Sequence, residues 1–240
     1  MVEYESIIER NGQAPYLGCP DGQVSCKDAA QIPDGTTAAY IWPKCKNLDQ
    51  LSFHRSLVDV QTQLTPEIVE HLKDLPNLKR VQFSLPRTDR IPKLEPLSQI
   101  ETLVLCCNKH QTSINFINGM ASLRNLCISE AMGVTRLTAI GKLPKLEELY
   151  IDGQISKRNT VQSLAPLGRL CELRYLVLLL RLPKEKRTLK PLHKLKNLRF
   201  LHLSDDYSDE QYFALLRNIP PLGMIHFNGG KTVSLPLNAG

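Results

Sequence analysis

Residues 100–108 read Ile-Glu-Thr-Leu-Val-Leu-Cys-Cys-Asn, and much of the fold can be worked out from them. Leu103 and Leu105 are separated by one residue, so their side chains lie on the same face of a short β-strand. Ile100 enters from the turn before the strand, and Asn108 can hydrogen-bond to backbone groups where the chain bends away. A single unit of this kind cannot bury its own apolar side, so the pattern predicts neighbouring copies.

Seven other segments carry apolar residues in the same register, at the first, fourth and sixth positions. They are Leu48-Leu51-Phe53, Leu78-Val81-Phe83, Leu123-Leu126-Ile128, Leu146-Leu149-Ile151, Leu173-Leu176-Leu178, Leu198-Leu201-Leu203 and Leu222-Ile225-Phe227. The middle residues of successive segments are 30, 22, 23, 23, 27, 25 and 24 residues apart. Eight in-register copies at similar spacing indicate a structural repeat.

The pattern L-x-x-L-x-L-x-x-N resembles the core motif of the leucine-rich-repeat family, over roughly residues 46–230. The resemblance implies an α/β solenoid: a right-handed superhelix of about eight repeats with a curved parallel sheet on its concave side. The sequence departs from the family at the asparagine position, which only Asn108 matches. The equivalent residues elsewhere are Ala131, Gln154, Arg181, Asp206 and Gly230. The sequence therefore argues against an uninterrupted asparagine ladder.

The segments between the strands predict a thin convex side. The clearest helix begins near Thr65, which can cap it, and Pro66, which suits the first helical position. Other segments repeat apolar residues every third position, which suits a 3₁₀ turn or a short irregular helix. They are Ile91-Leu94-Leu97, Val134-Leu137-Ile140-Leu143 and Val161-Leu164-Leu167-Leu170. Such thin convex sides resemble the short-repeat subclass of the family.

Both ends of the chain are expected to cap the solenoid. Residues 1–45 do not fit the repeat and are interpreted as an N-terminal cap, with residues 38–42 as its best strand. Residues 46–230 form the repeat domain. Within it, Ser208 and Gln211 have capping-box spacing and predict a helix to about Arg217. Residues 231–240 are expected to form a C-terminal capping strand, in which Val233, Leu235 and Leu237 alternate, and a tail.

The cysteines and the N-terminus bear on the compartment. Secreted members of the family often carry a cysteine-stapled N-terminal cap, which would pair Cys19 with Cys26. The N-terminus lacks the basic and apolar regions of a signal peptide, so we favour two buried, reduced thiols in a cytoplasmic protein. Export without a recognisable signal peptide is the alternative. No segment approaches the ~18 uninterrupted apolar residues of a membrane span.

Residues that flank the ladder leucines predict the composition of the concave face. From the fifth repeat onwards this face gains aromatic and apolar side chains, which often mark interaction sites when exposed. The expected partner-binding residues are Tyr150, Asp152, Tyr175, Val177, Leu179, Phe200, His202, Met224 and His226. We therefore predict a monomeric, non-catalytic protein–protein interaction module: a scaffold, regulator, effector or immunity protein. A loop or tail over this face, or padding of the sheet, would explain the same residues without a partner.

Residues 181–199 predict a second candidate surface, because eight lysines and arginines occur there against the single acid Glu185. The alternative function is therefore binding of nucleic acid or of acidic phosphate surfaces. Nucleic acid is the less favoured partner, since no aromatic residues are interleaved with the basic ones. A solvated convex loop is the simpler explanation. The net charge of the whole chain, +6, allows an acidic partner without requiring one.

Catalysis and cofactor binding find little support in the sequence. Cys127 would need His202 or His226 beside it, but these lie three or more strands further along, at about 4.8 Å per strand. His202 and His226 are predicted neighbours without a third metal ligand nearby. The common phosphate-loop and hydrolase motifs do not occur. We therefore expect no enzymatic activity, no metal and no cofactor.

Overall fold

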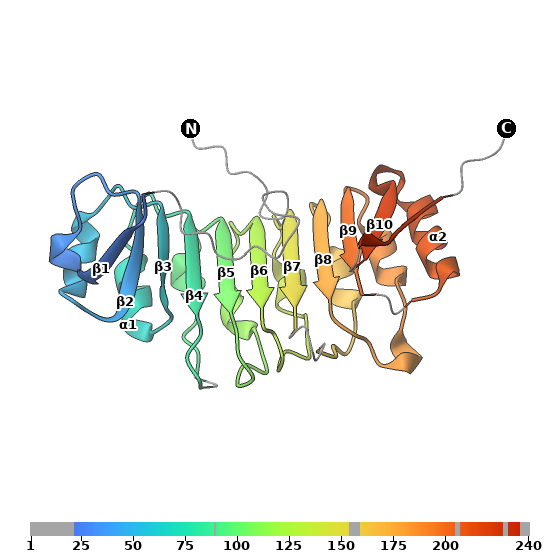
Figure 1. Cartoon of the computed structure of the whole chain (residues 1–240), viewed down its shortest axis with the longest axis horizontal. Coiled ribbons are helices and arrows are strands. Elements are labelled where there is room, and N and C mark those ends of the chain that lie inside the picture. Colours follow the sequence, from blue (N-terminus) through green and yellow to red (C-terminus); the bar gives the residue numbers. More distant parts are fainter. Residues whose placement is uncertain (1–21, 89, 154–158, 205–206, 228–229, 236–240) are drawn as a thin grey trace.

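A computed structural model describes residues 22–88, 90–153, 159–204, 207–227 and 230–235 of the chain. Within these residues, eleven strands lie side by side in one sheet, in the order of the sequence. Strands β1 to β10 pair in parallel, and β11 runs antiparallel to β10. Figure 1 shows that the sheet is curved and open, with the helical segments behind it. This arrangement confirms the predicted α/β solenoid.

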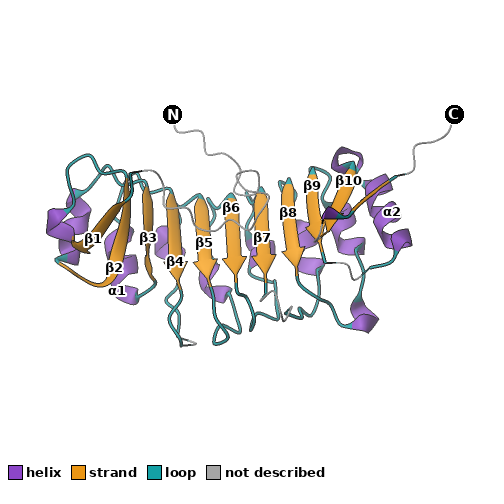
Figure 2. Cartoon of the chain, viewed as in Figure 1, coloured by secondary structure: helices purple, strands orange, loops and turns teal. Residues whose placement is uncertain are grey.

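The strands are β1 (Val24–Asp28), β2 (Ala38–Lys46), β3 (Asp59–Gln63), β4 (Arg80–Ser84), β5 (Thr102–Cys106), β6 (Asn125–Ser129), β7 (Glu148–Asp152), β8 (Tyr175–Leu179), β9 (Phe200–Leu203), β10 (Met224–Phe227) and β11 (Thr232–Ser234). The α-helices are α1 (Pro66–Leu72) and α2 (Asp209–Asn218). The 3₁₀ helices are η1 (Ala29–Gln31), η2 (Leu48–Phe53), η3 (Glu95–Leu97), η4 (Asn115–Ile117), η5 (Ile140–Lys142), η6 (Ala165–Arg169), η7 (Lys184–Lys186), η8 (Lys190–Lys194) and η9 (Pro220–Leu222). Figure 2 shows the short helical segments between and behind the strands.

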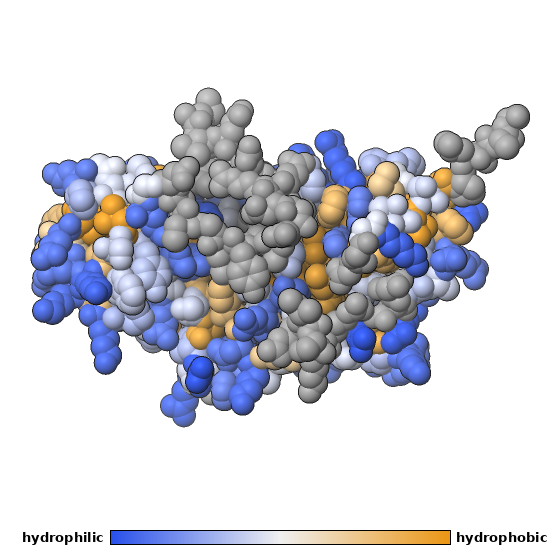
Figure 3. Space-filling view, viewed as in Figure 1, coloured by the Kyte–Doolittle hydropathy of each residue, from blue (hydrophilic) through white to orange (hydrophobic). Residues whose placement is uncertain are grey.

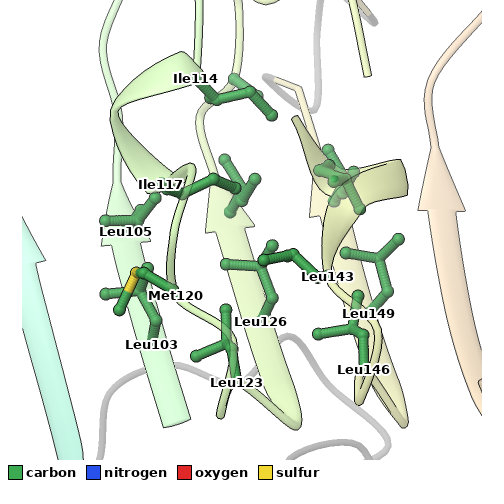
Figure 4. Close-up of a cluster of buried hydrophobic side chains, with 14 of the residues drawn as sticks. Leu103, Leu105, Ile114, Ile117, Met120, Leu123, Leu126, Leu143, Leu146 and Leu149 are labelled. Atoms are coloured by element: carbon green, nitrogen blue, oxygen red, sulfur yellow. The ribbon is translucent and has the colours of Figure 1, made fainter. Parts of the chain in front are cut away.

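The core is an aliphatic ladder between the sheet and the helical layer. Leu103, Leu126 and Leu149 lie in register on β5, β6 and β7, and all three are buried. Figure 4 shows these side chains facing those of the convex segments, among them Ile117 and Leu143. Each repeat therefore buries its apolar side against its neighbours, as the sequence predicted.

The convex side confirms the predicted 3₁₀ segments. The groups with three-residue spacing contribute to η3, η5 and η6, and their leucines are buried. These turns stack closely, because a Cβ atom on Gly141 would lie 2.5 Å from the carbonyl oxygen of Pro166. The predicted helix is α1, whose N-cap Thr65 accepts a hydrogen bond on Oγ1 from the Ile68 N–H at 3.1 Å.

The predicted first repeat strand is wrong. Leu51, expected in a strand, lies in the 3₁₀ helix η2, and the strand of this repeat is β3. Val60 of β3 pairs in register with Ala39 of β2 and Val81 of β4, so the expected 30-residue gap contains an additional strand. The register is hard to see in the sequence because a buried Thr62 replaces the second ladder leucine. The expected strand at residues 38–42 is confirmed as part of β2.

The C-terminal part bears out one expectation and corrects another. Val233 lies in β11, beside β10, whereas Leu235 is exposed and Leu237 lies outside the described residues. Helix α2 begins after Ser208 as predicted, but the Ser208 side chain makes no capping hydrogen bond. The capping box is therefore wrong. Gln211 instead binds the preceding repeat, where its Oε1 accepts from the Leu189 N–H at 2.9 Å. The domain boundaries at residues 45 and 230 stay predictions.

Asn108 is predicted to stabilise the repeat through hydrogen bonds from its side chain to backbone groups. Its Nδ2 donates to the carbonyl oxygen of Leu85 at 3.1 Å, and its Oδ1 accepts from the His110 N–H at 3.0 Å. Asn108→Ala should lower the free energy of unfolding by about 1–3 kcal/mol, since part-buried backbone groups lose their partners. Urea denaturation would measure the loss. The exposed neighbour Lys109, changed to Ala, should stay within about 0.5 kcal/mol of wild type; equal effects of the two changes would contradict the assigned role.

Candidate partner-binding face

The face of the sheet opposite the core brings four of the predicted site residues into one row. Tyr150 pairs with Val177, Val177 with His202, and His202 with His226. The row crosses β7 to β10 without a break because these parallel strands keep their register. Side chains alternate along a strand, so all four point away from the ladder leucines.

A second row, closer to the start of the strands, carries aromatic rings. Tyr175 and Phe200 pair in register, with ring centroids 6.5 Å apart and ring planes at 33°. Phe200 also stacks on the His226 ring, at 4.8 Å and 20°. Three rings from β8, β9 and β10 therefore lie next to one another on this face. Offset ring pairs at such distances are worth roughly 0.5–1.5 kcal/mol beyond their burial.

The structure corrects the expectation that the whole face is wet. Tyr150 and Val177 are only 7% and 4% exposed, and together with Val104 and Cys127 they form a second buried cluster, separate from the main core. Tyr175, Leu179 and Phe200 pack against this cluster and remain half-buried. Side chains in the middle row pack against one another across adjacent strands. Val104 and Cys127 are not among the predicted site residues, although they share the strand position of Tyr150.

The accessible part of the site therefore lies on β8 to β10. Met224 is 44% exposed, and His202 and His226 are half-buried. Figure 3 shows hydrophobic surface over β8 on this side of the molecule. The accessible residues are named the aromatic surface below and are Tyr175, Leu179, Phe200, His202, Met224 and His226.

Asp152 is tied into the fold of the face. Its Oδ2 accepts a hydrogen bond from the Tyr150 hydroxyl at 2.9 Å, and its Oδ1 accepts from the Glu130 N–H at 2.9 Å. Burial raises the pKa of the Asp152 carboxyl, and these two hydrogen bonds oppose the rise. Both oxygens are engaged within the chain, so Asp152 orients Tyr150 and the turn at Glu130.

Cys127 and His202 lie on the same face of the sheet but are not adjacent. Tyr150 and Val177 lie between Cys127 and His202 in the register, so these two residues do not form a nucleophile–base pair. Burial raises the pKa of the Cys127 thiol well above its ordinary value, which disfavours the reactive thiolate. Within the described ranges, no group of three or more His, Cys, Asp or Glu residues could hold a metal ion.

Among the described residues, no helix is long and apolar enough to cross a membrane.

The basic segment 181–199 lies mostly on the convex side, around η7 and η8. Arg181, Lys184, Lys186, Lys190, Lys194, Lys196 and Arg199 are exposed there. Lys196 donates from Nζ to the carbonyl oxygen of Asn218 at 2.8 Å. Arg187 is half-buried and donates from Nε to the carbonyl oxygen of Leu182 at 3.3 Å. The segment thus forms an outward-facing positive region around η7, η8 and the loops beside them.

This chain resembles known proteins in its fold. No family model matches the chain, and no curated protein matches it by sequence. Among solved structures it is similar to internalin C2 from Listeria monocytogenes, with a TM-score of 0.56 and 20% identity, covering 86% of this chain and 80% of that one. The chain therefore has the fold of a leucine-rich-repeat solenoid.

Two further solved structures resemble this solenoid with lower TM-scores. An internalin (inlF) from Listeria monocytogenes has a TM-score of 0.48 and 19% identity, covering 79% of this chain and 65% of that one. A leucine-rich-repeat protein from Leptospira interrogans has a TM-score of 0.46 and 18% identity, covering 75% of this chain and 56% of that one.

Proposed function

We propose that this leucine-rich-repeat solenoid is a non-catalytic interaction module that binds a partner protein through its aromatic surface. The observation that carries the proposal is the accessible stack of Tyr175, Phe200 and His226, with Met224 exposed beside it. Aromatic residues and Met are enriched in the buried centres of protein interfaces. Exposed apolar patches rimmed by polar groups often mark interaction sites.

The surface is also preorganised for binding. Phe200 is held between Tyr175 and His226, and all three project from paired strands of one sheet. Rings that are already fixed lose little conformational freedom when a partner covers them, so more of the contact energy contributes to affinity. The buried cluster around Tyr150 supports the surface from the side of β7.

We infer that the partner carries a net negative charge. The residues from Asn159 to Ser204, which include β8 and β9, contain ten lysines and arginines against two glutamates, a net charge of +8. The whole chain carries +6, so this region holds all of the excess positive charge. Complementary charge around an apolar contact speeds association and rejects partners of the wrong sign.

The test compares wild type with the Tyr175→Ala/Phe200→Ala variant. Partners captured from a native lysate by wild type are identified, purified and titrated against both proteins. We expect the variant to fold, because both side chains lie outside the core, and to bind at least ~100-fold more weakly, as expected for the loss of two hot-spot residues. The matched control is Gln63→Ala/Ser84→Ala, a pair in register on the same face at β3 and β4. It should bind like wild type.

Equal binding by wild type and the aromatic variant would contradict the site, and failure of the variant to fold would place the rings in the core. The alternative function has its own signature. A nucleic acid that binds the aromatic variant normally, but is lost when Lys184, Lys186 and Lys190 are changed to Gln and when salt is raised, would favour phosphate binding. The cytoplasmic location and the monomeric state stay predictions.

A further inference from the structure

Two thiols meet in the N-terminal part of the sheet. Cys26 lies on β1 and Cys45 near the end of β2, and their Sγ atoms are 3.5 Å apart. Their side chains are buried, at 3% and 8% exposure. The family resemblance offers a Cys19–Cys26 disulfide as the alternative to two reduced thiols, but Cys19 lies outside the described residues. The structure instead places Cys45 against Cys26.

A bulge in β2 produces this contact. Cys26 pairs with Ile41, and Asp28 pairs with Lys46, so one residue of β1 faces residues 42–45 of β2. Within the bulge, Lys44 has a left-handed backbone with φ of 64°. The extra residues leave the regular ladder and bring the Cys45 side chain back onto β1. Bulges of this kind re-aim a side chain, and here the side chain is a thiol.

The C-terminal end of the bulge is anchored. The Asp28 Oδ1 accepts a hydrogen bond from Asn47 Nδ2 at 2.8 Å and one from the Ala30 N–H at 3.1 Å. These contacts tie the end of β1 to the residue that follows β2. The two sulfur atoms are therefore kept as neighbours, and a shift of roughly 1.5 Å would bring them to disulfide bonding distance.

We propose that Cys26 and Cys45 are a disulfide-forming pair that staples β1 to β2 when the protein meets an oxidising thiol–disulfide environment. The thiolate of one cysteine attacks a small-molecule disulfide such as oxidised glutathione and releases one glutathione thiolate. The thiolate of the second cysteine then attacks the mixed disulfide and releases the other. Two electrons pass from the cysteine pair to the oxidant, and the two cysteine protons end on the two glutathione thiols.

The closed structure protects this pair. Burial and the adjacent Cys26 thiol together raise the pKa of Cys45 to about 12, so the thiolate is scarce at neutral pH. β1 is the first strand of the sheet and pairs only with β2 in the described part of the chain. Edge elements open more readily than the core, and opening of β1 would expose both thiols together. Once formed, the disulfide would restrict this opening.

The test uses the full chain and is independent of any partner. Reduced protein is incubated with oxidised glutathione, digested without reduction and mapped by mass spectrometry. We expect a Cys26–Cys45 linked peptide, about 2 Da lighter than the two thiol peptides together. The oxidised protein should melt roughly 5–10 °C higher, and dithiothreitol should reverse the shift. Cys171→Ala, which removes an exposed thiol, should leave both results unchanged.

A second experiment is needed in case the buried Cys26 and Cys45 thiols react slowly in the fully folded protein. Oxidation is repeated in urea below the global transition, where β1 opens first. If Cys26 and Cys45 remain free thiols under both conditions, or if Cys19 is linked to either of them instead, the proposal is overturned. Cys45→Ala should abolish the oxidant-dependent rise in melting temperature. A rise that persists in this variant would also overturn it.

Discussion

Leu201→Ala is expected to lower the free energy of unfolding by about 2–5 kcal/mol, the range for deletion of a fully buried leucine side chain. Leu201 has 0% exposure and lies in register with Leu176 on the neighbouring strand. The change removes a ladder contact and leaves a cavity between β9 and the helical layer. Urea denaturation of wild type and variant would measure the loss.

Arg199→Ala is the matched control, because Arg199 is exposed and only two residues away. It should change stability by no more than about 0.5 kcal/mol. Repeats contact mainly their neighbours, so hydrogen exchange should show the loss of protection from Leu201→Ala concentrated in β8 to β10. A loss below about 1 kcal/mol would mean that Leu201 is not a ladder residue.

The sequence located β4 to β10 accurately. The predicted ladder residues Val81, Leu103 and Leu126 are each the second residue of their strands, as are Leu149, Leu176, Leu201 and Ile225. Large apolar side chains at both buried positions of a strand leave a pattern that few other structures produce. In β3, Thr62 takes the second buried position, so this strand does not match the apolar pattern. The neighbouring segment Leu48-Leu51-Phe53 matches the pattern but forms η2.

The candidate site was predictable in its composition but not in its exposure. Alternation along a strand identifies Tyr150 and Val177 as face residues, and the register confirms that they are neighbours. Their burial depends on packing with Val104 and Cys127 from other repeats, which no single repeat reveals. The contact of Cys26 with Cys45 was equally hidden, because it depends on a left-handed backbone at Lys44 inside a strand.

Arg80→Ala should destabilise the protein by about 3–4 kcal/mol at pH 7, the lower part of the range for breaking a buried ion pair. Arg80 and Asp59 pair in register on β4 and β3, with Nη1 and Oδ2 2.5 Å apart and side chains 17% and 10% exposed. Burial raises the pKa of Asp59 above its ordinary 3.8, even though Arg80 acts to lower it. Without Arg80, a largely buried carboxylate loses its counter-ion.

The loss of stability in Arg80→Ala should depend on pH. An acid whose pKa is higher in the folded than in the unfolded state loses stability as the pH rises through that interval. Arg80→Ala should raise the folded pKa of Asp59 further, so the deficit should be small below the ordinary value of 3.8 and grow towards neutral pH. Urea denaturation of both proteins between roughly pH 3 and 8 would measure it.

The control removes the charge that Arg80 leaves behind. In Asp59→Asn/Arg80→Ala no carboxylate is buried, so this double variant should be more stable at pH 7 than Arg80→Ala alone, and its difference from wild type should depend less on pH. Asp59 Oδ1 has no hydrogen-bond partner among the described residues, so the unfavourable burial is concentrated on this one group. Two results would contradict this explanation: a loss of stability in Arg80→Ala that does not change with pH, or a double variant no more stable than Arg80→Ala. Either result would show that Arg80 acts through packing of its side chain instead.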